Sequence, residues 1–269
     1  MGGVSRIASG RDTLAAETAG SGPAVVFLHA NICDRRMWRA QMDALGAACR
    51  VVAYDRRGFG ETGAASEDHS AVADLMAVLD AAVGPAPAVL VGCSQGANIA
   101  LGAALMHPSR VSGLVLISPT ASGAPTAVYT PELRKLVEQQ QQAQAAGDLQ
   151  RLNEIKARLF LDGPLAPEGR AAQALRRLFL DMNAIALRAA GGGANRDDWP
   201  VFHRLSEIRV PSTVVWGKLD FPHIQERARA IARLLPDAQG RELQHAAHLA
   251  GLEQPAAVTG AIMELLGRC

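Results

Sequence analysis

Short apolar segments alternate with longer segments of helical periodicity along most of the chain. Runs rich in Val, Leu and Ile are typical of buried strands, whereas apolar residues three and four positions apart predict helices. Their alternation is typical of βαβ units, in which helices cover both faces of a mostly parallel sheet. The segment before Ala24 is expected to form an antiparallel hairpin that turns near Gly10. The clearest predicted strands are residues 24–29, 50–54, 88–92, 111–118 and 212–217.

The alternation stops from Pro119 to about Ser206, where helical patterns follow one another without a convincing strand. Thr130 and Pro131 are typical of a helix start, and Gly147 is typical of its end. Two further helices are predicted over residues 148–161 and 167–190. The last one carries an apolar stripe of Leu175, Leu178, Phe179, Met182 and Ile185. This stripe is expected to pack onto the core, and part of it could wall a substrate pocket.

We therefore predict a core with an insertion. Residues 1–118 together with residues 207–269 form the α/β core, and residues 119–206 form a helical lid or cap. A chain of 269 residues, 49% of them hydrophobic, can bury about three quarters of its unfolded surface. It needs no disulfide or metal to hold this fold together.

Charge and cysteine content narrow the classes of partner. The 27 basic and 26 acidic residues give a net charge of +1, without a long run of either sign. This pattern offers no attraction for nucleic acid or an anionic membrane, so we expect a small ligand without strong charge. No oligomeric state is predicted. The four cysteines form no CxxC pair, which argues against a disulfide framework and a zinc cluster: Cys33, Cys49, Cys93 and Cys269.

The chain also lacks a recognisable export or membrane segment. Its first residues carry no apolar stretch of the length that a secretory signal requires, and no apolar run of about 18 residues follows. We therefore expect a cytoplasmic location.

The strongest local pattern is Gly-Cys-Ser-Gln-Gly at residues 92–96, between a predicted strand and a predicted helix. A serine hydroxyl is a weak nucleophile unless it is exposed and a base takes its proton, and a sharp strand-to-helix turn provides the exposure. We predict Ser94 as the nucleophile; a tight glycine turn with an incidental serine is the alternative. The N–H of Gln95 stands at the helix N-terminus, where it can point at an oxyanion. Cys93 is expected to face the interior and to be inert.

The C-terminal part of the chain contains candidates for the base that would activate Ser94 and for the acid that would orient this base. A histidine suits the base because it titrates near neutral pH. His245 and His248 both stand there; together with His223 they could bind a metal, but no clustered carboxylate or cysteine completes such a site. The acid that orients the base should follow a strand between the serine and the histidine. Asp220 meets this condition, with a helix cap as the alternative.

Four motifs in this order resemble those of the α/β-hydrolase family: His29-Ala-Asn31, Gly92 to Gly96, Gly217-x-x-Asp220 and His248-x₄-Glu253-x-Pro255. The resemblance implies a mostly parallel central sheet of about eight strands with helices on both faces and an inserted helical lid. It favours His248 over His245 as the base, because the offset of His248 to the following Glu and Pro matches.

The same resemblance assigns two further segments. The N–H of Asn31 becomes the second oxyanion donor, although Ala30 stands where the family commonly has glycine. His29 is then a structural histidine. The turn at residues 55–60, Asp-Arg-Arg-Gly-Phe-Gly, also matches a family element and is expected to be scaffold.

The resemblance implies nucleophilic attack on a carbonyl. Serine at the nucleophile position argues against haloalkane dehalogenases and epoxide hydrolases, which use a carboxylate there. A carboxylesterase or lactonase that acts on a small, largely apolar ester-like substrate without a cofactor is the first choice. Perhydrolase, C–C hydrolase and hydroxynitrile-lyase chemistry on the same triad stay open, as does a non-catalytic small-molecule receptor of the same fold.

Overall fold

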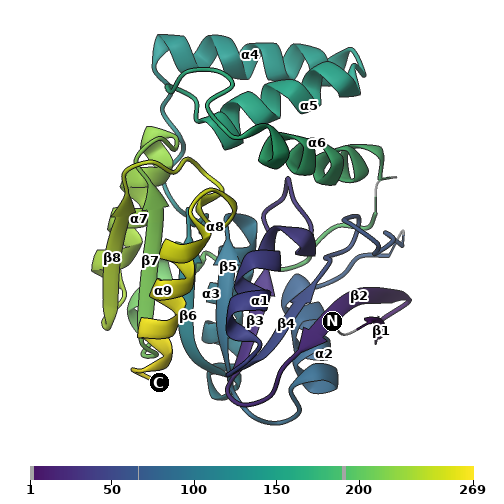
Figure 1. Ribbon diagram of the computed structural model, residues 1–269, viewed down its shortest axis with the longest axis vertical. Coiled ribbons are helices and arrows are strands. Elements are labelled where there is room, and N and C mark those ends of the chain that lie inside the picture. The colour runs from purple at the N-terminus through teal and green to yellow at the C-terminus, as the bar shows by residue number, and fades with distance from the viewer. Residues whose placement is uncertain (1–2, 66, 190–191) are drawn as a thin grey trace.

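The structure, a computed structural model, describes residues 3–65, 67–189 and 192–269. Within these residues one eight-stranded sheet has helices on both faces (Figure 1). Its order is β1-β2-β4-β3-β5-β6-β7-β8; β1 and β2 form the expected antiparallel hairpin, and the strands from β4 to β8 are parallel. The predicted fold class is confirmed. The strands are β1 (Val4–Ser9), β2 (Asp12–Ala19), β3 (Ala24–Leu28), β4 (Arg50–Tyr54), β5 (Ala88–Cys93), β6 (Val111–Ile117), β7 (Ser212–Gly217) and β8 (Ala238–Leu243).

Two apolar layers hold the helices to the sheet. Successive strand residues point to opposite faces, so that Val26 and Leu28 of β3 pack into one layer whereas Val25 and Phe27 pack into the other. The first layer contains residues of α2 (Ala71–Ala82), α3 (Gln95–Met106) and α7 (Pro222–Leu234). The second contains residues of α1 (Arg39–Leu45), α8 (Ala250–Glu253) and α9 (Pro255–Leu266). The described residues also contain the 3-10 helices η1 (Arg35–Trp38), η2 (Pro108–Arg110) and η4 (Val201–Glu207).

The segment from Pro119 to Ser206 contains the three predicted helices, which lie together at one end of the molecule (Figure 1). They are α4 (Pro131–Ala145), α5 (Leu149–Ala157) and α6 (Gln173–Arg188). Thr130 caps α4 through its side chain, as expected, and Gly147 follows that helix with a φ of 67°. The division of the chain into a core and a lid stays a prediction.

One predicted helix boundary in this segment is wrong. The second helix reaches residue 161 as expected, because α5 continues directly into a π-helical turn, η3 (Arg158–Asp162). The third begins at Gln173 and not near Pro167, because the buried Asp162 carboxylate accepts the N–H groups of Gly169 and Ala171 and holds this stretch as a loop. Its predicted end, at residues 190–191, lies outside the described residues.

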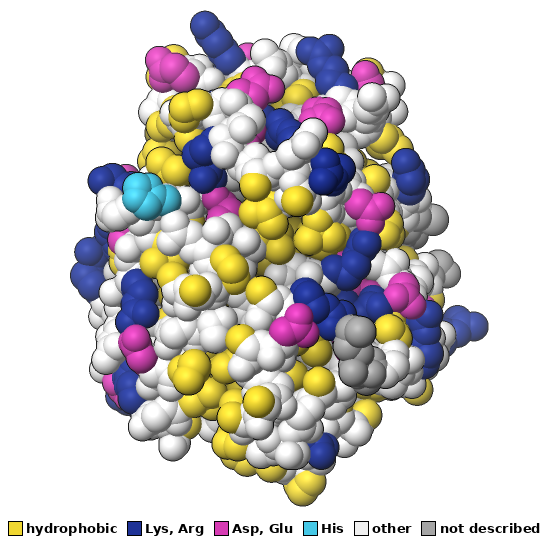
Figure 2. All heavy atoms as spheres, in the orientation of Figure 1, with side chains coloured by type: hydrophobic (Ala, Val, Ile, Leu, Met, Phe, Trp, Pro, Cys, Tyr) yellow, Lys and Arg dark blue, Asp and Glu magenta, His cyan; other side chains and the backbone are white. Residues whose placement is uncertain are grey.

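The surface agrees with the balanced composition. Figure 2 shows basic and acidic side chains interspersed over the visible face. No helix in the described ranges combines the length and the hydropathy that crossing a membrane requires. The expectations about partners and location remain predictions.

Candidate active site

Ser94 lies at the sharp turn between β5 and α3, in a backbone conformation that residues other than glycine rarely adopt. Its φ is 53° and its ψ is −115°. Such a conformation costs about 1–3 kcal/mol and persists where its surroundings hold it. The Ser94 N–H donates to the Ile117 carbonyl at 2.9 Å, and the Ser94 carbonyl accepts from Thr120 Oγ1 at 3.0 Å. The serine therefore occupies a strained strand-to-helix turn of the kind that the sequence predicts.

Gly92 and Gly96 flank this turn because no larger residue fits. A Cβ at Gly92 would lie 2.5 Å from the carbonyl carbon of Gly96, and a Cβ at Gly96 would lie 2.2 Å from the carbonyl oxygen of Leu28. The close approach lets α3 start directly beside β3 and β5. Cys93 is fully buried, and burial raises the pKa of its thiol well above the usual range. It is the inert interior residue that we expected.

His248 and Asp220 form a buried pair at the ends of β7 and β8. His248 Nδ1 lies 2.9 Å from one carboxylate oxygen of Asp220 and 3.1 Å from the other. The Phe221 N–H also donates to this carboxylate, at 2.8 Å, so Asp220 caps the next segment as well. Because Nδ1 faces a carboxylate, we assign the ring proton to Nδ1, which leaves Nε2 free to accept a proton. His245, in contrast, is exposed.

The inserted segment holds the His248 loop in place. The His248 N–H donates to the Phe160 carbonyl at 3.3 Å, and the Phe160 ring lies 5.2 Å from the imidazole. Glu253 accepts the Ala247 N–H at 3.0 Å and forms an ion pair with Arg170. Burial raises the pKa of the Glu253 carboxyl, and the Arg170 hydrogen bond opposes that rise. Sequence reasoning missed Phe160 and Arg170, because nothing local marks either one.

The serine turn and the histidine loop are neighbours. The Cys93 thiol lies 3.7 Å from the His248 carbonyl oxygen. In the part of the chain that the structure describes, Ser94 Oγ makes no direct hydrogen bond to the His248 ring. Catalytic hydrogen bonds of this type are often long until a substrate closes the site. The structure therefore brings His248 together with Asp220, and places the Ser94 turn against the same loop.

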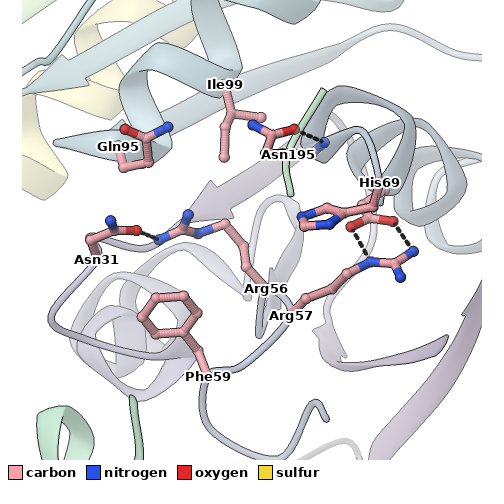
Figure 3. A pocket seen from close by; sticks show the side chains of 10 residues that line it. Asn31, Arg56, Arg57, Phe59, His69, Gln95, Ile99 and Asn195 are labelled. Carbon is pink, nitrogen blue, oxygen red and sulfur yellow. Dashed lines mark hydrogen bonds and ion pairs between the residues drawn. The ribbon is translucent and has the colours of Figure 1, made fainter. Parts of the chain in front are cut away.

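Asn31 and Gln95 line the same pocket, which has a volume of about 280 Å³ (Figure 3). Gln95 is the first residue of α3, where an N–H has no intrahelical partner. Neither the Gln95 N–H nor the Asn31 N–H donates to another described residue. Two donors are thus available at the positions that the sequence predicts. Ala30 is fully buried without a positive φ, so this loop conformation does not require glycine.

His29 is a structural residue. It is fully buried, its Nδ1 contacts the Ala30 carbonyl at 2.8 Å, and its Nε2 accepts the Arg56 N–H at 3.0 Å. Burial and the Arg56 charge hold the pKa of His29 well below its ordinary value. The neutral ring therefore ties the Asn31 loop to the turn that follows β4.

That turn, residues 55–60, is scaffold in part only. Asp55 is buried, accepts the N–H groups of Arg35 and Glu61, and pairs with the Arg35 guanidinium. Arg57 donates to Asp74 from two nitrogens, each at 2.9 Å. Arg56, Arg57 and Phe59 of this turn also line the pocket that contains Asn31 and Gln95.

A group of aromatic rings lies on the other side of His248. Phe160 contacts Phe221, whose ring lies 6.5 Å from Tyr129 and 5.4 Å from His223. Burial lowers the pKa of His223 to about 4, so this ring is neutral at physiological pH. Among the described residues, no group of three or more His, Cys, Asp or Glu side chains is placed to hold a metal ion.

A model of the family described as "alpha/beta hydrolase fold" matches residues 23–255, which confirms the resemblance. The malate-bound structure of a thermophilic esterase from Thermogutta terrifontis is 26% identical with a TM-score of 0.76, and the match covers 99% of this chain and 98% of the other. The 2-hydroxy-6-oxo-6-phenylhexa-2,4-dienoate hydrolase of Burkholderia cepacia is 27% identical over 92% of this chain and 89% of its own length. Epoxide hydrolase B of Mycobacterium tuberculosis is 40% identical, but the match spans 38% of this chain and 30% of that relative.

Proposed function

Because the chain belongs to the alpha/beta hydrolase fold family, we propose that it is a serine hydrolase that cleaves a carboxylic ester or lactone. The buried His248–Asp220 pair, with Nδ1 and the carboxylate 2.9 Å apart beside the Ser94 turn, is the observation that carries this proposal. A buried carboxylate on Nδ1 fixes the imidazole tautomer and stabilises the imidazolium that forms when Nε2 takes up a proton.

In the proposed reaction Ser94 Oγ attacks the ester carbonyl carbon while His248 Nε2 takes the hydroxyl proton. Asp220 stabilises the resulting imidazolium, and the N–H groups of Asn31 and Gln95 donate to the oxyanion. His248 then gives its proton to the leaving oxygen as the C–O bond breaks, which leaves an acyl group on Ser94. Water, deprotonated by His248, attacks this acyl-enzyme and releases the acid.

Serine also explains why the local similarity to an epoxide hydrolase does not carry that activity over. A serine oxygen that opened an epoxide would form an ether, which has no carbonyl for water to attack. The enzyme would stop after one turnover. An acyl-serine, in contrast, is an ester and can be hydrolysed.

Hydrolysis of an activated C–C bond is the second candidate. It is supported by the match to the Burkholderia cepacia hydrolase, which spans 92% of this chain. Both candidates use Ser94 and His248, and they differ in the bond that breaks at the acyl carbon, which is C–O in an ester and C–C in the second candidate. We expect a small, largely apolar substrate in both cases, because the Phe160 ring lies beside His248 and packs against Phe221.

A series of p-nitrophenyl esters of increasing chain length tests the proposal. We expect a burst of p-nitrophenol followed by steady turnover, and a fall of at least about a thousandfold in Ser94→Ala. Turnover that is unchanged in Ser94→Ala would refute the mechanism. The absence of ester turnover, with cleavage of a vinylogous diketone acid, would favour the C–C candidate instead.

A further inference from the structure

Arg56 is a cation without a carboxylate partner, in a part of the molecule where nearby arginines have one. Arg35, Arg36 and Arg57 each form an ion pair with at least one carboxylate. In the described ranges, no Asp or Glu oxygen lies within 4.0 Å of the Arg56 guanidinium, and the undescribed positions 1–2, 66 and 190–191 hold no acidic residue. The charge of this side chain is therefore not matched within the site.

The contacts of Arg56 orient it without neutralising it. One terminal nitrogen donates to Asn31 Oδ1 at 2.9 Å, and the guanidinium lies over the Phe59 ring at 4.7 Å. Its Nε is buried without a partner. Burial lowers the pKa of Arg56 to about 10, so the group stays charged at neutral pH. The side chain is only partly buried, so this charge can attract an anion in the pocket.

The pocket beside Arg56 presents more donors than free acceptors. Figure 3 shows Arg56 and Arg57 pointing in opposite directions, with Asn31, Gln95 and His69 around the space. Asp74 also lines the pocket, but Arg57 holds both of its oxygens. The Asn195 Oδ1 is engaged by the Ala71 N–H, which leaves its amino group available. His69 Nδ1 is buried without a partner.

The place of this pocket suggests which part of a substrate enters it. The leaving oxygen must lie next to His248, which protonates it, and the Phe160 ring packs against this imidazole. The Arg56 pocket is lined by Asn31 and by Gln95, which directly follows Ser94, and not by Ser94, His248 or Asp220 themselves. The acyl chain, which stays on Ser94 when the leaving group departs, is therefore the part that extends toward Arg56.

We propose that the Arg56 pocket binds a free carboxylate on the acyl part of the substrate. The substrate is then a monoester of a dicarboxylic acid, or a lactone that opens to one, with an apolar leaving group. This inference rests on the proposed function and refines it, since the substrate carries one negative group next to an otherwise apolar body. Arginine suits this task because its planar fork matches the two carboxylate oxygens.

Two matched esters test the inference. Mono-p-nitrophenyl glutarate and p-nitrophenyl valerate have acyl groups of the same carbon count, and only the first ends in a carboxylate. We expect the wild type to prefer the glutarate ester in kcat/KM. In Arg56→Met the ratio of the two values should fall by at least about tenfold, mainly through KM, and Arg56→Lys should retain part of it. Arg50→Met, which removes an exposed guanidinium that donates to the Ala82 carbonyl, should leave the ratio unchanged.

The ratio separates recognition from a positioning role. If Arg56 only held the Asn31 loop, both esters would lose activity alike and the ratio would stay constant, which would overturn the inference. A wild type that prefers the valerate ester would overturn it too.

A binding measurement makes the failure of this inference distinguishable from failure of the proposed function. Glutarate is titrated calorimetrically into Ser94→Ala and into the same protein with Arg56→Met. Binding that is lost with Arg56 supports the pocket assignment even if neither ester is hydrolysed. The absence of glutarate binding to Ser94→Ala contradicts it even if ester hydrolysis is rapid.

Discussion

The two sides of the site differ in how their charges are balanced. At the ends of β7 and β8, the Asp220 carboxylate is matched by His248 and by the Phe221 N–H. At the end of β4, the Arg56 guanidinium has an amide oxygen and an aromatic ring but no anion. On the first side the protein itself supplies the partners of the charged group, and the pair is suited to proton transfer. The second side lacks a counter-charge, which is typical of a surface that a ligand completes.

Adjacent arginines show the same contrast on a smaller scale. Arg57 turns toward the β1–β2 hairpin, where it donates to the Ser9 carbonyl and to Asp12, each at 2.9 Å, as well as to Asp74. Arg56 turns toward the pocket. Both arginines line the pocket, but the Arg57 guanidinium is paired with carboxylates of the scaffold, whereas the Arg56 guanidinium is left for a ligand.

The largest effect on activity is expected from a substitution in the His248–Asp220 pair. Asp220→Asn keeps an acceptor for the Phe221 N–H, but its amide can donate to Nδ1 and so move the imidazole proton to Nε2. We expect kcat for ester hydrolysis to fall about 10⁴-fold, measured with p-nitrophenyl butyrate. Asp237→Asn, an exposed acid that pairs with Arg268, is the matched control and should keep full activity. A loss of less than tenfold in Asp220→Asn would contradict the role given to this pair.

A smaller effect is expected from removing the Arg170–Glu253 ion pair, which links the inserted segment to the His248 loop. Arg170→Met leaves the buried Glu253 without its cation, and an unpaired buried charge is destabilising by about 3 kcal/mol. Urea unfolding should show this loss, and kcat should fall about tenfold as the His248 loop shifts. Arg177→Met, on the exposed face of α6, should change neither quantity. If Arg170→Met unfolds like the wild type, the ion pair is not structural.

The smallest effect concerns pH and the aromatic side of the site. The pKa of His223 is about 4 in the folded protein, below its ordinary value of 6.5, so the unfolded chain takes up the proton first. The stabilisation from the neutral ring is complete above pH 6.5 and is lost as the pH falls toward 4. The free energy of unfolding should therefore drop by up to about 2 kcal/mol from this group between pH 7.5 and pH 5.

The variant His223→Phe fits among Tyr129 and Phe221 and should remove that part of the pH dependence. His245→Asn, at an exposed position, should retain it. Equal pH dependence in the wild type and in His223→Phe would rule out this contribution.

The sequence was most informative where function depends on local chain geometry. The Ser94 turn needs glycine on both sides within five residues, and the backbone contacts at Gly92 and Gly96 explain why. The offset from His248 to Glu253 likewise reflects a short loop, in which the Glu253 carboxylate bonds the Ala247 N–H. Such constraints act between residues that are close in the sequence, so they produce short motifs that can be recognised there.

What the sequence did not reveal depends on contacts between distant segments. Strand β8, Ala-Gln-Gly-Arg-Glu-Leu, stands at the sheet edge with half-exposed residues and so has no apolar run. The Arg170–Glu253 ion pair joins two residues that are 83 positions apart in the sequence. The different directions of Arg56 and Arg57 follow from the packing of the turn against the hairpin, and identical neighbouring residues carry no sign of it.

Covalent labelling of Ser94 tests the central claim most directly. The folded protein is treated with a fluorophosphonate probe, and the modified residue is located by peptide mass spectrometry. We predict one adduct per chain, on Ser94, that disappears in Ser94→Ala and in His248→Ala. Failure of the folded wild type to react, or an adduct at another residue that persists in Ser94→Ala, would contradict a serine-hydrolase mechanism at this site.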